Sequence, residues 1–215
     1  MLALVPCKNL NFGKSRLAEH LDPDSRRSLC EFLLRSTLEL IAEVFSPDSV
    51  RLVTPDARAA AIGLGYGIRH IEDGGCGLNQ ALSTARAVVL NERPLLSRAL
   101  IFPIDLPYAT ASSLEQLLNH QEDVVIVPDR AKSATNAMVL TANAFPAFSF
   151  AFGRGSYHVH LSQARHAGQS VRSVVDERLT FDLDRPCEYD QWIGDRKKRA
   201  SSCNSLLEWT SGNQR

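Results

Sequence analysis

The stretch LALVPCKNLNFGKSRLAEHL, residues 2–21, decides the fold of this chain. Its first four residues, Leu2–Val5, are apolar and predict a short buried strand, which Pro6 ends. The loop that follows carries three cations, Lys8, Lys14 and Arg16. A strand that opens directly into a short cationic loop is typical of an α/β protein that binds phosphate groups beyond the end of a strand.

The tripeptide Gly13-Lys14-Ser15 resembles the end of a P-loop, in which glycine amides bind phosphate. That motif needs a second glycine five residues before Gly13, and Lys8 occupies this position. The spacing therefore excludes a P-loop. The Lys and Arg side chains themselves would contact a polyphosphate, Arg as a planar fork and Lys as a mobile point charge. The alternative is a solvated basic loop.

Beyond this stretch, short β-type runs alternate with helical patterns, which predicts βαβ units, a mainly parallel sheet and helices on both of its faces. The expected strands cover residues 2–5, 50–54, 67–71, 99–104, 124–128, 136–141 and 171–175. The expected helices cover residues 28–45, 77–90, 112–121 and 156–168. We expect an α/β fold with one domain over residues 1–194. The polar residues 195–215 are expected to form a tail, with a docked terminal helix as the alternative.

The composition narrows the range of partners. The chain has 215 residues, enough for one sizeable core, and 24 basic residues balance 24 acidic ones. No global field would attract nucleic acid or a membrane surface, so small molecules are the expected partners. No apolar stretch reaches the roughly 18 residues of a membrane span. Five scattered cysteines without metal-ligand spacing favour reduced thiols and a cytoplasmic location. Whether the chain forms a homodimer stays open.

A carboxylate follows another apolar strand in IFPIDLP, residues 101–107, where Asp105 stands between two prolines that stiffen the chain. Ligands of parallel sheets bind beyond the carboxyl ends of strands, and Mg²⁺ prefers carboxylate and phosphate oxygens. Asp105 is therefore a candidate Mg²⁺ ligand. Its alternative role, capping the helix near Ser112, is disfavoured because it lies several residues too early.

Two more carboxylates, Asp182 and Asp184, lie on one side of the extended segment FDLD, residues 181–184. Either could be a second metal ligand. An Asp pair before Arg185-Pro186 is also a common turn signal, and that alternative stays open.

Two glycine-rich turns precede predicted helices. EDGGCGLNQAL, residues 72–82, brings backbone amides and Asn79 to a position where a nucleotide could approach closely. A flexible turn with a helix cap is the alternative for this segment. FGRGSYHVH, residues 152–160, brings Gly153, Gly155 and Ser156 together beside Arg154, an arrangement that favours an anionic group.

Six segments occur in a characteristic order: VPCKNLNFGKSRLA (5–18), DGGCGLNQAL (73–82), FPIDLP (102–107), VPDR (127–130) with ATNAMVL (134–140), FGRGSYHVHLSQA (152–164) and FDLDRP (181–186). Together they are similar to the 2-phospho-L-lactate guanylyltransferase family of deazaflavin coenzyme F-420 biosynthesis. The resemblance covers roughly residues 1–190 and implies a single-domain nucleotidyltransferase-like fold. It also implies transfer of GMP from GTP to the phosphate of a small phosphorylated acid, with release of pyrophosphate.

Taken residue by residue, the resemblance implies three groups of site residues. The GTP triphosphate would contact Lys8, Lys14 and Arg16. Mg²⁺ would bind Asp105 and Asp184, with Asp73 as a weaker candidate. The acid would bind at Thr135, Gly153 and Ser156. The catalytic groups would be Lys14, Arg16 and Asp105.

The chain departs from this family at Ala131-Lys132-Ser133-Ala134, where the family usually has glycines. An added cation and a less flexible backbone reshape the pocket, so phospholactate, phosphoenolpyruvate and 3-phosphoglycerate all stay candidate acids. Three other functions are alternatives. A molybdenum-cofactor nucleotidyltransferase normally has a loop richer in glycine, and a sugar-phosphate nucleotidyltransferase is usually longer. The third is a module that binds nucleotide without turnover, against which Asp105 and Asp184 argue.

Overall fold

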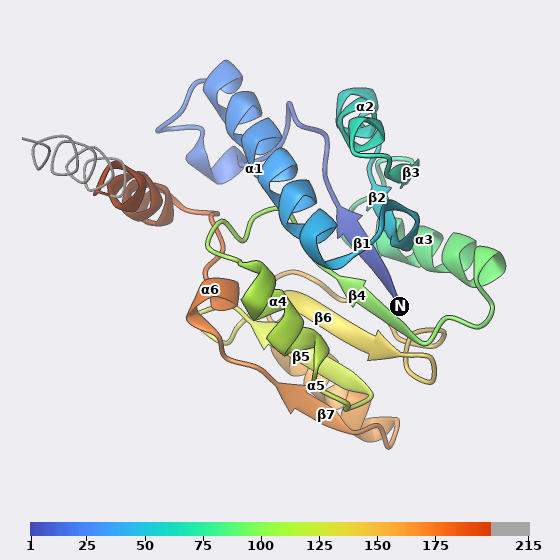
Figure 1. Ribbon diagram of the computed structural model, residues 1–215. Helices are drawn as coiled ribbons and strands as arrows, with labels where there is room; N and C mark the ends of the chain where they lie inside the picture. Colours follow the sequence, from blue (N-terminus) through green and yellow to red (C-terminus); the bar gives the residue numbers. More distant parts are fainter. Residues whose placement is uncertain (199–215) are drawn as a thin grey trace, which may run out of the picture.

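A seven-stranded sheet with the strand order β3-β2-β1-β4-β6-β5-β7 separates two layers of helices (Figure 1). The computed structural model describes residues 1–198. The strands are β1 (Leu2–Pro6), β2 (Val50–Val53), β3 (Arg69–Ile71), β4 (Arg98–Ile101), β5 (Val124–Pro128), β6 (Thr135–Thr141) and β7 (Val171–Ser173). The helices are α1 (Pro23–Val44), α2 (Ala57–Gly65), α3 (Leu78–Glu92), α4 (Ala111–Leu118), α5 (Ser156–His166) and α6 (Glu177–Thr180), with 3₁₀ turns η1 (Ser15–Leu17) and η2 (Pro47–Ser49).

One strand of the sheet, β6, runs opposite to the others. It pairs antiparallel with both β4 and β5, whereas all other pairs are parallel. The predicted mainly parallel α/β fold is thus confirmed, although the antiparallel strand was not expected. Its direction matters, because Thr135 at the start of β6 pairs with Pro128 at the end of β5. The first residues of β6 therefore lie at the edge where the parallel strands end.

The helices cover both faces, as the alternation predicts. Along β1, Ala3 and Val5 belong to the buried cluster that contains α1 and α4 residues. Leu2 and Leu4 belong to the cluster that contains α3 and α5 residues. All four are fully buried. Full burial of one large aliphatic side chain contributes roughly 1.5–3 kcal/mol, so the opening strand anchors both layers.

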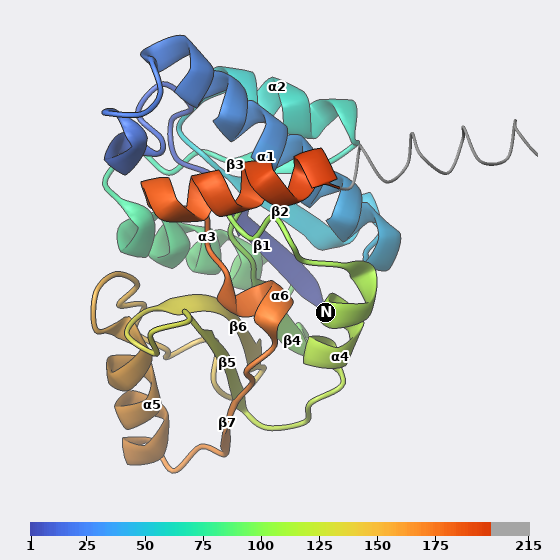
Figure 2. The same ribbon diagram turned by 90° about the vertical axis from the view of Figure 1, so that its left-hand side faces the viewer.

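Besides the short helix α6 and the two 3₁₀ turns, two longer helical segments were not expected from the sequence. The first is α2, which begins after Asp56, whose carboxylate accepts hydrogen bonds from the N–H groups of Arg58 and Ala59 at 2.8 and 3.1 Å. Its alanine-rich pattern is short and only weakly periodic. The second covers residues 186–198 and lies near α1 in Figure 2. Trp192 of this segment packs on Phe32 of α1, with ring centroids 5.7 Å apart.

The expected domain boundary at residue 194 falls inside this second helical segment. Residues 195–198 continue this helix. The rest of the expected tail, residues 199–215, lies outside the described residues. Four cysteines are free thiols, Cys7, Cys30, Cys76 and Cys187, whereas Cys203 lies outside the described part. No helix within residues 1–198 combines the length and apolar character needed to cross a membrane.

Candidate active site

The loop after β1 turns back on itself at Lys14, which has left-handed backbone angles of φ 51° and ψ 39°. Few residues other than glycine adopt this conformation, and strained positions of this kind cluster at functional sites. The turn brings the Lys14 ammonium to two carboxylates. Its Nζ donates to Asp105 Oδ2 at 3.1 Å and to Asp184 Oδ1 at 2.9 Å. Arg16 Nη1 donates to the second oxygen of Asp184 at 3.2 Å.

Backbone contacts hold the two carboxylates side by side. The N–H of Leu183 donates to the carbonyl oxygen of Asp105 at 2.9 Å, which joins residues 181–184 to the loop after β4. The buried amide of Asn136, at the start of β6, donates to the carbonyl oxygen of Leu179 at 3.0 Å. These contacts hold residues 181–184, which have no regular secondary structure. Asp184 thereby comes close to Asp105, 79 positions earlier in the chain.

The electrostatics of this cluster follow from its geometry. The Lys14 side chain is only 6% exposed, and burial alone would lower its pKa. The charges of Asp105 and Asp184 outweigh that effect and raise the pKa of Lys14 above its usual value. For Asp184, burial alone would raise the pKa, but the nearby charges of Lys14 and Arg16 lower it below its usual value. Lys14 and Asp184 are therefore both ionised near neutral pH.

Asp182 differs from its neighbour Asp184. Burial and the negative charges of Asp105 and Asp184 raise the pKa of Asp182 to about 7. Asp184, in contrast, contacts both cations directly. Of the two candidates for the second metal ligand, the geometry favours Asp184.

Two carboxylates that position the site were not found by sequence reasoning. Asp56 Oδ2 accepts the N–H of Leu10 at 2.9 Å and so holds the cationic loop against the start of α2. Glu188 Oε2 accepts the N–H groups of Asp184 and Arg185 at 2.8 and 2.7 Å. The only sequence signal for Asp56 is an Asp before a possible helix, which indicates a cap and not a loop contact.

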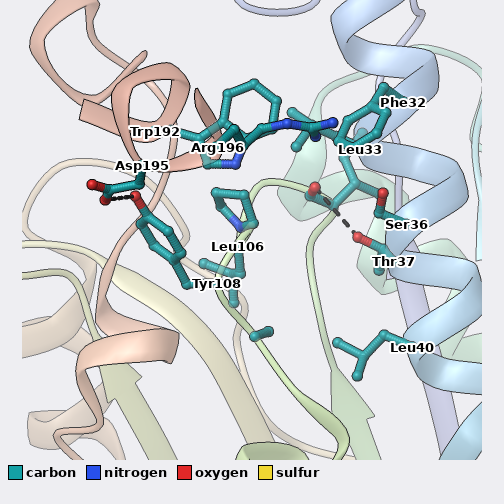
Figure 3. A pocket seen from close by; sticks show the side chains of 13 residues that line it. Phe32, Leu33, Ser36, Thr37, Leu40, Leu106, Tyr108, Trp192, Asp195 and Arg196 are labelled. Carbon is teal, nitrogen blue, oxygen red and sulfur yellow. Dashed lines mark hydrogen bonds between the residues drawn. The ribbon is translucent and has the colours of Figure 1, made fainter. Parts of the chain in front are cut away.

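The loop that carries Asp105 lies against a cavity of about 250 Å³ (Figure 3). The cavity is bounded by α1, residues 104–109 and the helical segment 186–198. Thr37 of α1 donates to the carbonyl oxygen of Ile104 at 3.3 Å, and the Tyr108 hydroxyl donates to Asp195 at 2.6 Å. Both hydrogen bonds are drawn in Figure 3. Asp195, expected in a polar tail, therefore helps to hold the loop of Asp105.

The residues that could bind a metal fit a magnesium ion. Asp105 and Asp184 come from separate loops and already share one cation, the Lys14 ammonium. Carboxylate oxygens are ligands that Mg²⁺ prefers, and it commonly takes only one or two of them together with substrate phosphates. Within residues 1–198, no group of three or more His, Cys, Asp or Glu side chains could hold a metal. The remaining ligands would have to come from substrate and water.

A second cluster joins the start of β6 to the start of α5. The N–H of Thr135 donates to Ser156 Oγ at 2.8 Å, and the N–H of Ser156 donates to the carbonyl oxygen of Gly153 at 3.1 Å. Gly153 has a φ of +127° and Gly155 one of +81°, conformations that favour glycine. Thr135 and Ser156 are buried, whereas Gly153 is exposed. The three predicted acceptor residues are thus neighbours in space.

The loop between β5 and β6 is built around Asp129. Its carboxylate accepts the N–H groups of Ser133 and Ala134 at 2.6 and 3.0 Å. Lys132, in the segment where the related family usually has glycines, has a left-handed φ of 52°. The carbonyl oxygen of Ser133 accepts the N–H of Tyr157 at 3.3 Å, so this loop lies on the start of α5.

Three other predicted site residues make no hydrogen bond or ion pair with Lys14, Arg16, Asp105 or Asp184. Asp73 accepts the N–H of Gly75 at 2.8 Å and is not grouped with Asp105 and Asp184. Lys8 is exposed, yet it is close enough to contribute to the lowered pKa of Asp184. Asn79 makes a pair of hydrogen bonds with the backbone of Phe152, at 3.1 and 2.7 Å. Its amide thus binds the backbone just before Gly153, in the segment that also carries Ser156.

The fold and the charged cluster define a class of protein, the nucleotidyltransferase-like enzymes. The architecture is similar to that of CMP:2-keto-3-deoxy-manno-octonic acid synthetase complexed with CTP, with a TM-score of 0.62 and 13% sequence identity. The matched region covers 92% of this chain and 98% of that one. At this identity, the likeness concerns the fold alone.

Sequence comparison identifies the family within this class. Residues 1–189 match the family described as guanylyl transferase CofC like, and the chain belongs to that family. It is 34% identical over 206 residues to a phosphoenolpyruvate guanylyltransferase of Sphaerobacter thermophilus, covering 95% of this chain and 98% of the relative. It is 30% identical over 185 residues to a 2-phospho-L-lactate guanylyltransferase of Methanothermobacter thermautotrophicus, covering 85% and 79%. The predicted family and enzyme class are confirmed.

Proposed function

We propose that this nucleotidyltransferase transfers GMP from GTP to the phosphate of a small phosphorylated acid and releases pyrophosphate, with Mg²⁺ as its cofactor. 2-Phospho-L-lactate, phosphoenolpyruvate and 3-phosphoglycerate are the candidate acids. A place in coenzyme F-420 biosynthesis belongs to the same proposal. The names of the relatives support the nucleotide and the first two acids.

The observation that carries the proposal is the position of the Lys14 ammonium between Asp105 and Asp184, with Arg16 beside them. Three chain segments bring two anions and two cations to the edge where the parallel strands end. Such a cluster can bind a triphosphate and a divalent cation together. The divalent cation takes the place of the Lys and Arg groups beside the carboxylates, and the triphosphate takes the place of the carboxylates beside Lys and Arg.

The chemistry needs little proton transfer. A phosphate oxygen of the acid attacks the α-phosphorus of GTP, and the bond to the bridging oxygen breaks as pyrophosphate leaves with its electron pair. The attacking phosphate oxygen of the acid is already anionic near neutral pH, so positioning and charge neutralisation are the main contributions of the protein. Lys14 and Arg16 would stabilise the charge that accumulates on pyrophosphate.

Asp105 and Asp184 would hold Mg²⁺, which when bound neutralises charge on the phosphates of the nucleotide. The carboxylates would then no longer need Lys14 as their counterion. Its flexible stem would let the ammonium turn toward the triphosphate. At the other cluster, Thr135, Gly153 and Ser156 would orient the acid.

The test is to incubate the purified chain with GTP, Mg²⁺ and each of the three acids, following pyrophosphate release and the mass of the product. We expect release with at least one acid and a product heavier by one GMP unit. ATP, CTP and a sugar phosphate serve as controls for nucleotide and acceptor. GTP binding without release for any acid would favour a binding module, and preferred release with a sugar phosphate would indicate the other enzyme class.

A further inference from the structure

His160 of α5 is a fully buried histidine that makes two hydrogen bonds. Its Nε2 is 3.0 Å from the backbone N–H of Ala151, and its Nδ1 is 2.9 Å from the Thr135 hydroxyl. The rings of Phe148 and Phe152 pack against it, with centroids 5.4 and 5.1 Å away. This apolar setting explains why burial lowers the pKa of His160 to about 4. The imidazole is therefore neutral near pH 7.

The hydrogen bond from Ala151 determines which ring nitrogen carries the proton. A backbone N–H can only donate, so Nε2 must accept and must be unprotonated. In a neutral imidazole the proton then lies on Nδ1, which donates to Thr135 Oγ1. The hydroxyl hydrogen of Thr135 is consequently not used by His160. Thr135 Oγ1 makes no other hydrogen bond to residues 1–198.

The neighbouring hydroxyl is arranged in the same way. Ser156 Oγ accepts the N–H of Thr135, so its own hydrogen is also available to a ligand. The hydroxyl oxygens of Thr135 and Ser156 thus each accept a hydrogen bond from the protein, and their hydroxyl hydrogens remain to donate to a ligand. Such a pair complements an acceptor-only group, which describes an ionised carboxylate or phosphate.

We propose that His160 is a positioning residue for the acceptor acid: held by Ala151, it orients the Thr135 hydroxyl to donate to an anionic oxygen of the acid. This inference rests on the proposed function, because it assumes that an acid binds at Thr135. On this proposal, His160 does not contact the acid itself. It fixes the direction in which the hydroxyl of Thr135, which does contact the acid, donates its hydrogen. Asn79 supports the same arrangement, since it holds Phe152, the residue after Ala151.

Two substitutions separate the two hydrogen bonds of His160. In His160→Asn the amide nitrogen lies near the position of Nδ1 and can still donate to Thr135, but the contact with Ala151 is lost. In His160→Gln the amide reaches the position of Nε2 and its oxygen can accept from Ala151, but the donor to Thr135 is lost. His160→Asn leaves the larger gap in the core, because the Asn side chain is one methylene shorter than Gln. A smaller effect of His160→Asn on KM therefore cannot come from better packing.

The experiment measures the KM for the acid, kcat and GTP affinity for both variants, with thermal melting to verify folding. We expect His160→Gln to raise the KM for the acid roughly tenfold, which corresponds to about 1.4 kcal/mol, with GTP affinity unchanged. His160→Asn should stay within roughly threefold of the wild-type KM. Equal effects of the two variants on KM, or a larger effect of His160→Asn, would overturn the proposal.

A second measurement does not depend on turnover. The ¹⁵N chemical shifts of the His160 ring distinguish a protonated Nδ1 from a protonated Nε2, and we expect protonation at Nδ1. Protonation at Nε2 would overturn the inference even in an active enzyme. If the wild-type chain released no pyrophosphate with any acid while His160 carried its proton on Nδ1, the proposed function would fail instead, because acid binding would be unsupported.

Discussion

The two ends of the site are built by opposite means. At the proposed phosphate end, ion pairs between the side chains of Lys14, Arg16, Asp105 and Asp184 join three loops. At the proposed acceptor end, Thr135, Ser156 and His160 are neutral, buried and joined by hydrogen bonds that involve the backbone. On the proposed function, the charged groups would exchange partners when a metal and a nucleotide bind, whereas the neutral groups are already arranged. Binding of Mg²⁺ and GTP would require the charged side chains to change partners, whereas the acid would have to be held in one orientation for its attack.

The largest expected effect concerns the metal. Asp105→Asn keeps the shape but removes the charge that Mg²⁺ would need, so pyrophosphate release should fall by at least a hundredfold, worth about 3 kcal/mol, while the fold stays intact. Pyrophosphate release and circular dichroism measure the two properties. The matched control is Asp73→Asn, which should have little effect because Asp73 contacts neither cation nor the carboxylate pair. Wild-type turnover by a folded Asp105→Asn variant would refute the assignment.

The second prediction separates the cationic loop from an ordinary basic surface. Lys14→Met should reduce turnover roughly a hundredfold, because it removes a contact to the developing charge. It also leaves two carboxylates without their shared cation, so Mg²⁺ should raise the melting temperature of this variant more than that of the wild type. Arg16, whose side chain is 67% exposed, should matter less.

Lys198→Ala is the control for the cationic loop, since its side chain is 82% exposed and lies in the helical segment 186–198. It should leave turnover near the wild-type value. Comparable losses for Lys14→Met and Lys198→Ala would mean that the loop acts only through its general charge.

The third prediction concerns the acceptor end. Thr135→Ala and Ser156→Ala each remove one donor to an anion, a loss of about 1.5–3 kcal/mol in binding the acid. We expect a raised KM for the acid or a lowered turnover, with GTP affinity by calorimetry within roughly threefold of wild type. A loss confined to GTP binding would transfer both residues to the nucleotide.

The last prediction concerns a pH dependence of stability. The folded pKa of His160 is about 4, below the ordinary value near 6.5, so the unfolded chain binds a proton between these values that the folded chain does not. The free energy of unfolding should therefore fall as the pH decreases from about 6.5 toward 4, by up to about 1.4 kcal/mol per pH unit from this group. Urea unfolding at several pH values measures it. His160→Asn should show a weaker dependence, and an identical slope would contradict this origin.

Much of the fold was predictable because its signals are local. The apolar runs gave the strands β1, β2, β4 and β5, and the helical periodicity gave α1, α3, α4 and α5. The helix α2 was not predicted, because an alanine-rich stretch of nine residues carries little periodicity. The antiparallel direction of β6 was not predicted either, since strand direction depends on partners and not on composition.

The sequence by itself predicted the kinds of chemistry at the candidate site: cations after β1, a carboxylate at residue 105 and, through the family resemblance, a carboxylate at residue 184 and hydroxyls at residues 135 and 156. The side-chain types can be found directly in the sequence. The predicted parallel sheet then places the carboxyl ends of its strands at one edge. Only the tertiary structure decided which of them meet. Lys14 lies between Asp105 and Asp184, Asn79 binds a backbone segment, and His160 acts on Thr135. These contacts join residues far apart in sequence and depend on how loops pack, which periodicity and composition do not encode.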